Sequence, residues 1–101
     1  LALPDHEDQL GMLADTAEGS WVVWTPRLPV TLSGTGDVFA ALLLGEWLVT
    51  GDAQASLART ASALYALVET TWRAGSRELL LIAAQGAIVE PPHLFRPTRL
   101  R

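Results

Sequence analysis

The sequence predicts one domain that combines β-strands with α-helices, in the order hairpin, helix, helix, strand and tail. Three observations predict this class. Two short segments of strand-forming residues flank a turn, a long stretch of helical periodicity follows, and a continuous apolar segment of strand length comes after it. The chain has 101 residues, 50% of them hydrophobic, which suffices for one domain with a modest core.

A β-hairpin is expected first. Residues 10–16 and 20–25 are the two strands, and the Ala-Glu-Gly segment between them is typical of a turn. The second strand is rich in tryptophan and valine, which favour extended structure. The connection that follows, residues 25–33, contains two prolines that remove backbone donors and fix φ. This connection is therefore expected to be stiff and extended.

Two helices are expected next. Residues 37–49 are apolar on nearly every side, which is typical of a helix buried in a larger structure. Gly51 ends this helix, and Asp52 is placed to cap the second helix, residues 53–74, which Gly75 stops. The second helix has the clearest periodicity of the chain. Its apolar positions are Ala53, Leu57, Ala61, Leu64, Val68 and Trp72, and its wetter side has Gln54, Arg59, Ser62, Glu69 and Arg73.

A strand covered on both faces is predicted for residues 78–84, because they form a continuous apolar run. Gln85 and Gly86 then turn the chain, and three prolines make the tail irregular. A buried helix and a strand buried on both faces present more apolar surface than so few elements can cover. The chain is therefore expected to be part of a larger fold, or to have something else packed on it.

Composition excludes several classes of function. The net charge is −4 and all seven basic residues are arginine, thinly spread, so no nucleic-acid-binding face is expected. Without lysine the chain can supply neither a P-loop nor a Schiff base, and without cysteine neither a disulfide nor a thiolate zinc site. The longest apolar run, residues 38–44, is too short to cross a bilayer, and no signal-peptide pattern is evident. A cytoplasmic location without membrane contact is expected.

The histidines and tryptophans are expected to have structural roles rather than to bind a metal or a ligand. His6 lies among three acidic residues, but such a run is more typical of a solvated loop than of a metal site. His93 is expected to pack near Phe95, and no metal-binding residue is predicted. Packing contacts, rather than stacking on a ligand, are expected for Trp21, Trp24, Trp47 and Trp72.

The segment Gly34-Thr35-Gly36-Asp37 combines features that suit phosphoryl transfer. Two glycines allow the backbone to approach a ligand closely, and the free N–H groups of the helix that starts here attract an anion. Asp37 on the same turn could accept the proton of an attacking hydroxyl. By spacing alone, a tight turn with Asp37 as an N-cap explains the same residues, and that interpretation stays open at this point.

The residues around this segment resemble the C-terminal signature of the ribokinase-like superfamily, and within it the pyridoxal kinases. The signature is Gly34-Thr35-Gly36-Asp37-Val38-Phe39-Ala40-Ala41-Leu42-Leu43-Leu44. Further stretches extend the resemblance over essentially the whole chain. They are Thr25-Pro26-Arg27-Leu28-Pro29, Ala63-Leu64-Tyr65, the Glu-Leu-Leu-Leu-Ile-Ala-Ala-Gln segment at 78–85, Ile88, Pro92-His93-Leu94-Phe95 and Leu100.

The resemblance implies an α/β fold with a central, mostly parallel sheet flanked by helices. It implies ATP-dependent phosphorylation of the 5′-hydroxyl of pyridoxal, with Mg²⁺ and a monovalent cation such as K⁺, in a homodimer. Asp37 would be the catalytic base and would contact the substrate hydroxyl. The anion hole would be Gly34, Thr35 and Gly36, and the residues near the nucleotide would be Arg27, Leu28, Pro29 and Val30.

Length is where the sequence departs from the resemblance, since such kinases are considerably longer than this chain. Residues 1–101 are therefore expected to be the C-terminal part of the kinase domain, carrying the anion hole and the base but inactive alone. Two alternatives are another ribokinase-like vitamin or sugar kinase, and a non-catalytic fragment or interaction module.

Overall fold

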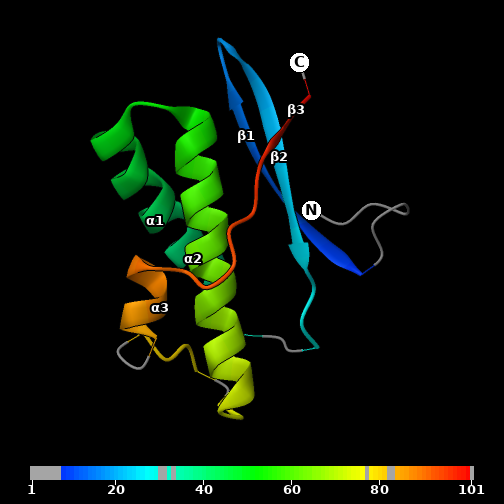
Figure 1. Ribbon diagram of the computed structural model, residues 1–101, viewed down its shortest axis with the longest axis vertical. Coiled ribbons are helices and arrows are strands. Elements are labelled where there is room, and N and C mark those ends of the chain that lie inside the picture. Colours follow the sequence, from blue (N-terminus) through cyan, green and yellow to red (C-terminus); the bar gives the residue numbers. More distant parts are fainter. Residues whose placement is uncertain (1–7, 30–31, 33, 77, 82–83, 101) are drawn as a thin grey trace.

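The computed structural model describes residues 8–29, 32, 34–76, 78–81 and 84–100, and Figure 1 shows its helices gathered on one side of a small sheet. The elements in chain order are β1 (Gln9–Thr16), β2 (Gly19–Pro26), α1 (Thr35–Thr50), α2 (Ala53–Arg73), α3 (Gln85–Val89) and β3 (Thr98–Arg99). Helix α2 packs on both strands of the hairpin, and α1 and α3 pack on α2. The hairpin and both long helices lie within two residues of their predicted bounds.

The sheet is antiparallel wherever the structure describes it. In the hairpin, Met12 pairs with Val23, and Thr16 pairs with Gly19 across the turn. A Cβ at Gly11 would lie 2.7 Å from the Trp24 ring, so glycine is what lets that ring cross the neighbouring strand. The mostly parallel sheet implied by the resemblance is absent from the described residues, and it stays a prediction for the longer kinases.

The prediction of a tail that is irregular throughout is wrong for β3. Its two residues pair with Trp21 and Val22 on the free edge of β2. The backbone N–H of Leu100 also donates to the Ser20 carbonyl at 2.7 Å. The prolines of the tail precede this pairing and remove none of these donors, which is why a short strand can form after them.

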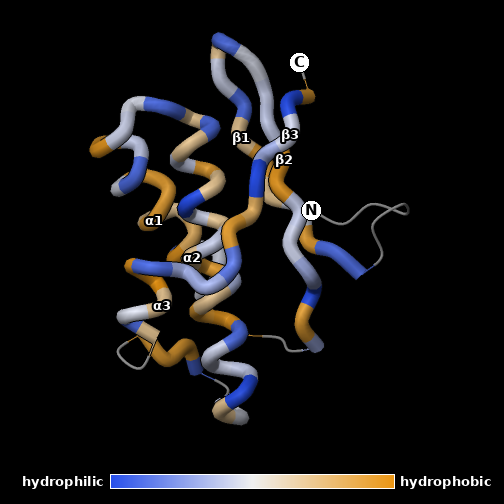
Figure 2. Tube along the Cα trace, in the orientation of Figure 1, coloured by the Kyte–Doolittle hydropathy of each residue, from blue (hydrophilic) through white to orange (hydrophobic). Residues whose placement is uncertain are grey.

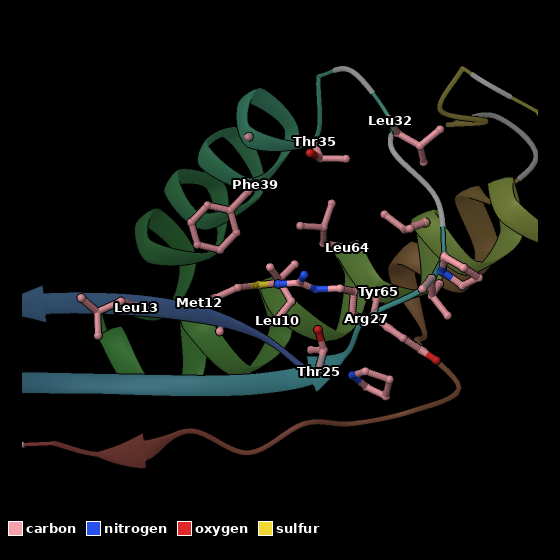
Figure 3. A pocket seen from close by; sticks show the side chains of 16 residues that line it. Leu10, Met12, Leu13, Thr25, Arg27, Leu32, Thr35, Phe39, Leu64 and Tyr65 are labelled. Carbon is pink, nitrogen blue, oxygen red and sulfur yellow. The ribbon is translucent and has the colours of Figure 1, made fainter. Parts of the chain in front are cut away.

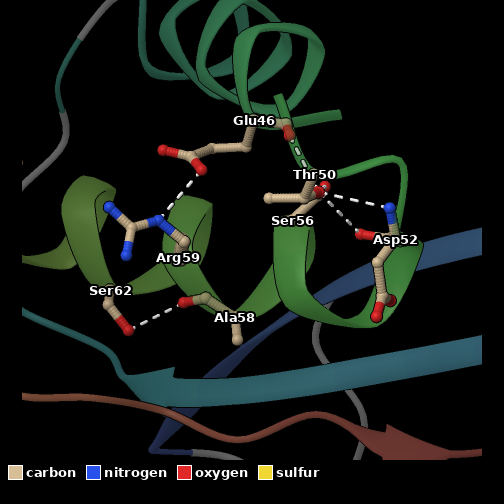
Figure 4. A network of polar contacts seen from close by, with 7 residues as sticks. All are labelled: Glu46, Thr50, Asp52, Ser56, Ala58, Arg59 and Ser62. Carbon is tan, nitrogen blue, oxygen red and sulfur yellow. Dashed lines mark hydrogen bonds and ion pairs between the residues drawn. The ribbon is translucent and has the colours of Figure 1, made fainter. Parts of the chain in front are cut away.

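The junction between α1 and α2 confirms the predicted helix signals. Figure 4 shows this junction with Thr50, Asp52 and the Glu46–Arg59 pair. Gly51 ends α1 with a left-handed φ of 65°, and its N–H donates to the Trp47 carbonyl. The Asp52 carboxylate caps α2 by accepting from the N–H groups of Gln54 and Ala55, at 2.9 and 3.2 Å. An ion pair of 2.9 Å between Glu46 and Arg59 links the two helices at the surface.

Helix α2 supplies most of the core. Leu57, Ala61 and Leu67 are fully buried, in one cluster with Met12 and Val23 of the hairpin. The predicted apolar stripe is confirmed up to Val68, which is partly buried against this cluster, whereas Trp72 at its end is 39% exposed. These residues contact the sheet because positions three or four apart lie on the same face of a helix.

Ser62, expected on the wetter side of α2, is buried instead. The tail crosses this part of the helix, and the Ser62 hydroxyl accepts a hydrogen bond of 3.0 Å from the Phe95 N–H. The same hydroxyl donates to the Ala58 carbonyl at 2.8 Å. Both of its bonds are made inside the protein, so its burial leaves no polar atom unpaired.

The strand predicted for residues 78–84 is wrong for its described residues, because 78–81 and Ala84 belong to no strand, while residues 82–83 lie outside the described part. No neighbouring strand in the described structure offers this run an edge, so its backbone bonds elsewhere. The Leu80 N–H donates to the Thr71 hydroxyl on α2 at 3.1 Å. The expected turn at Gln85 and Gly86 is likewise the start of the short helix α3, whose N-cap Ala84 is buried.

Helix α1 has no buried residue, although it is apolar almost throughout. Leu48 and Val49 are 75% and 84% exposed, and Figure 2 shows hydrophobic stretches along this helix at the edge of the molecule. If α1 is buried as predicted, the residues that cover it lie outside the described part of this chain. Among those residues, no helix has the length and apolar character needed to pass through a membrane.

Candidate active site

The glycine segment forms the start of α1. Gly34 is the N-cap, with a left-handed φ of 87°, and its carbonyl accepts the Val38 N–H at 3.1 Å. A residue with a Cβ would be strained there, which is why glycine is needed. Asp37 lies inside the first turn of the helix, and no side chain caps this end. The interpretation of Asp37 as a mere N-cap is therefore wrong.

The first turn is open to a ligand. The N–H groups at a helix start have no partner within the helix, and the helix dipole gives them partial positive charge. A Cβ at Gly36 would meet no atom of the described residues within 4 Å, so packing inside this chain does not require glycine at that position. Asp37 is exposed beside it. The turn can therefore accept an anion and present a carboxylate next to it.

A pocket of about 880 Å³ lies beside this turn, and Figure 3 shows the side chains that line it. It brings Thr35 and Gly36 of the predicted anion hole together with Arg27, Leu28 and Pro29 of the predicted nucleotide segment. Gly34 and Asp37 are not among its lining residues. Val30, the fourth residue predicted near the nucleotide, lies outside the described residues.

The other walls of the pocket are mostly apolar and come from β1, the end of β2, the connection after it, α1 and α2. The residues that sequence reasoning did not assign to a site are Leu10, Gly11, Met12, Leu13, Thr25, Pro26, Leu32, Phe39, Leu64, Tyr65 and Val68. The helical periodicity that placed Leu64 and Val68 on one face was the available signal, but it does not reveal that the glycine turn lies opposite them. A largely apolar pocket with a few polar groups is typical of a site for a small organic ligand.

Tyr65 on the α2 wall is held by several contacts. Its hydroxyl donates to Glu69 at 3.2 Å, and its ring meets Phe95 edge to face, with centroids 5.1 Å apart. The His93 ring also lies edge to face with Tyr65, with ring centroids 6.0 Å apart, whereas its packing near Phe95 stays a prediction. Burial, and then the charge and the hydrogen bond of Glu69, raise the pKa of the Tyr65 phenol above its usual 10.0.

No tryptophan lines this pocket in the described part of the chain. Trp21 is buried, and the Arg99 guanidinium lies 5.6 Å from its ring centroid, so its packing role is confirmed. Trp47 faces a second, smaller apolar pocket of about 430 Å³ between β1 and α1. No group of three potential metal ligands occurs among the described residues, while His6 and its acidic neighbours Asp5 and Glu7 lie outside them.

Curated proteins similar to this chain are pyridoxal kinases. The chain is 46% identical over 95 residues to pyridoxal kinase PdxY of Rubrobacter xylanophilus, covering 94% of this chain and 33% of that protein. It is 50% identical over 90 residues to PdxY of Deinococcus radiodurans, covering 87% of this chain and 30% of the relative. The chain thus spans about a third of the length of these relatives. None of the protein-family models matches it.

Solved structures share the fold. A pyridoxal kinase from Leishmania donovani in complex with ADP matches 99% of this chain and 38% of its own, with a TM-score of 0.82 and 24% identity. Plasmodium falciparum PdxK with AMP-PNP and PL matches 100% and 36%, with a TM-score of 0.79 and 15% identity. This chain is thus similar in sequence to pyridoxal kinases and similar in fold to solved pyridoxal kinases, and it corresponds to about a third of their length.

Proposed function

We propose that this chain carries the anion hole and the catalytic base of a kinase that transfers the γ-phosphoryl group of ATP to the 5′-hydroxyl of pyridoxal. The observation that carries the proposal is the single pocket lined by Arg27, Leu28 and Pro29 together with Thr35 and Gly36. It joins an apolar slot to the N-terminal turn of a 16-residue helix. A nucleotide needs both, since its base is flat and its phosphates are anionic.

Each part of the site has a role in this proposal. The apolar walls hold the base of ATP, and the N–H groups of the first turn of α1 bind the phosphoryl group as charge builds on its oxygens. Asp37, exposed on the same turn, orients the substrate hydroxyl in line and accepts its proton. A carboxylate suffices as the base because the hydroxyl becomes acidic late in a loose transition state.

Mg²⁺ fits this site as a partner of the nucleotide rather than of a protein cage. The described residues contain no group of three potential ligands, and Mg²⁺ usually keeps water and binds substrate phosphates with one or two carboxylates. Asp37 is the carboxylate nearest the anion hole in sequence. When bound, Mg²⁺ would neutralise charge on the phosphates. A monovalent cation such as K⁺ is part of the proposal only through the resemblance to the family.

The remaining two thirds of the kinase are expected on the N-terminal side of these residues. They would supply the pyridoxal pocket and would cover the exposed apolar side chains of α1, such as Leu44 and Leu48. A homodimer in the cytoplasm, where ATP is available, completes the proposal. Activity tests therefore belong in the complete protein that contains these 101 residues, and the 101-residue chain alone is expected to be inactive.

A second candidate is a kinase for another hydroxymethyl heterocycle. A phosphomethylpyrimidine kinase from Bacteroides thetaiotaomicron also matches the fold, over 81% of this chain with a TM-score of 0.68 and 23% identity. The fold does not separate the two substrates. The 46% and 50% identity to pyridoxal kinases favours pyridoxal.

The test is to supply the complete protein with ATP and Mg²⁺ and to follow phosphate transfer to pyridoxal and to an aminopyrimidine that carries a hydroxymethyl group. We expect a larger kcat/KM for pyridoxal. A larger value for the pyrimidine would favour the second candidate. No transfer to either compound would contradict the proposal and leave a kinase for another vitamin or a sugar and the non-catalytic alternative.

A further inference from the structure

The tail is fixed to the rest of the chain at two places, at Phe95 itself and at the short strand β3 that follows it. On α2, the Ser62 hydroxyl receives the Phe95 N–H at 3.0 Å. On the sheet, β3 pairs with β2, and the Arg99 guanidinium donates to the Glu18 carbonyl at 3.0 Å. The bond to Ser62 thus holds segment 93–95 against α2, although Ser62 and Phe95 are 33 positions apart in sequence. Its side chains have defined positions rather than those of a loose terminus.

Segment 93–95 contacts the pocket wall at Tyr65. The rings of His93 and Phe95 both approach Tyr65 at steep angles, 73° and 71° between ring planes. Tyr65 is one of the residues that line the large pocket (Figure 3), and neither His93 nor Phe95 is among them. Phe95 is half-buried and packs against the core cluster. The tail therefore contacts the pocket through Tyr65.

We propose that Tyr65 is a nucleotide-binding residue on the wall of this pocket and that Phe95 is a positioning residue that acts on the nucleotide through Tyr65. The proposal rests on the proposed function, in which this pocket holds the base of ATP. Two edge-to-face contacts and the bond to Glu69 hold the Tyr65 ring in one orientation, so the wall is already in its binding geometry before the nucleotide arrives. Pyridoxal, bound elsewhere, is not affected.

Kinetics of the complete protein test this, with ATP and pyridoxal varied separately. Phe95→Leu keeps the apolar volume but removes the ring. We expect KM for ATP to rise about three- to tenfold, with kcat and KM for pyridoxal within about twofold, because the lost contact serves nucleotide binding alone. Phe95→Tyr keeps the ring and is expected to keep KM for ATP.

Leu94→Ala is the matched control, because Leu94 lies beside Phe95 in the tail but is 77% exposed. Tyr65→Leu is the second arm and is expected to raise KM for ATP at least as much as Phe95→Leu. If Phe95 acts through Tyr65, the double variant has the KM of Tyr65→Leu alone, rather than the product of the two effects.

Three results would overturn the proposal. They are an unchanged KM for ATP in Tyr65→Leu, an equal rise of KM for pyridoxal in Phe95→Leu, and independent effects in the double variant. A Phe95→Leu protein that does not fold leaves the Tyr65→Leu arm decisive. The proposed function is tested separately: an active wild type that Asp37→Asn inactivates supports it, whatever the tail variants do.

Discussion

The Phe95 N–H and the Ser62 hydroxyl are hydrogen-bonded at 3.0 Å, although 33 positions separate the two residues in sequence. Ser62 is 1% exposed, and its hydroxyl also donates to the Ala58 carbonyl at 2.8 Å. One buried hydroxyl thus joins the middle of α2 to the tail that contacts Tyr65.

Ser62→Ala is therefore expected to destabilise the protein. The substitution leaves the Phe95 N–H without its acceptor in a partly buried place, which typically costs about 1–3 kcal/mol. Chemical denaturation of the complete protein should show this loss in the free energy of unfolding. An unchanged free energy of unfolding would mean that the N–H finds another partner.

Thr60→Val is the matched variant with the opposite expectation. Thr60 is fully buried on the same helix, and its hydroxyl has no hydrogen-bond partner among the described residues. Valine keeps the shape and removes the unpaired polar group, so the free energy of unfolding should stay the same or increase. The same denaturation experiment measures it, and a loss comparable to that of Ser62→Ala would contradict the account of both residues.

The two glycines of the anion hole should respond differently to alanine. Gly34 has a φ of 87°, so Gly34→Ala strains the backbone at the start of α1 by about 1–2 kcal/mol. Gly36 lies within the helix, and the space that a Cβ would occupy there is open, so Gly36→Ala should leave stability equal or slightly higher.

Gly36→Ala should lower activity without lowering stability. A methyl group there would project where the phosphoryl group is proposed to bind, so kcat/KM of Gly36→Ala should fall while the thermal midpoint is kept. Thermal unfolding and steady-state kinetics of both variants check this. An active Gly36→Ala enzyme would remove Gly36 from the anion hole.

Local signals predicted the hairpin and α2 well. Gly51, Asp52 and Gly75 act within one helical turn of themselves, so their effect can be predicted without knowing the rest of the fold. The apolar run at 78–84 could not be assigned in this way. A strand needs a neighbouring edge, and the described structure offers this run a hydroxyl of α2 instead.

The candidate site likewise has one part that local sequence signals predict and another part that depends on tertiary packing. The glycine turn can be recognised from a contiguous motif, although the helix starts at Thr35 with Gly34 as its N-cap, two residues before the predicted start at Asp37. Leu64 and Tyr65 could not be assigned to the pocket from sequence, because their place in it depends on how α2 packs beside the hairpin and α1. The periodicity also places Ser62 on the solvent side of α2. The tail covers that side, and its position cannot be predicted from the pattern of one helix.

Alkaline pH should reveal the environment of Tyr65. Burial first, and then Glu69, raise the pKa of its phenol above 10.0, the value expected in the unfolded chain. Its contribution to stability is therefore fully present below pH 10 and is lost as the pH rises through the folded-state pKa. In Tyr65→Phe this alkaline loss should be smaller than in the wild type, and unfolding measured across that range compares them. A larger loss in the variant would contradict the direction of the shift.

Asp37 is proposed as the base that activates the substrate hydroxyl. The most direct test is Asp37→Asn in the complete protein, because the amide keeps the size of the side chain but cannot accept the proton. We expect turnover of ATP and pyridoxal to fall by about 10²- to 10⁴-fold, the usual contribution of a general base, with nucleotide affinity largely kept. Turnover equal to that of the wild type would contradict the assignment of Asp37.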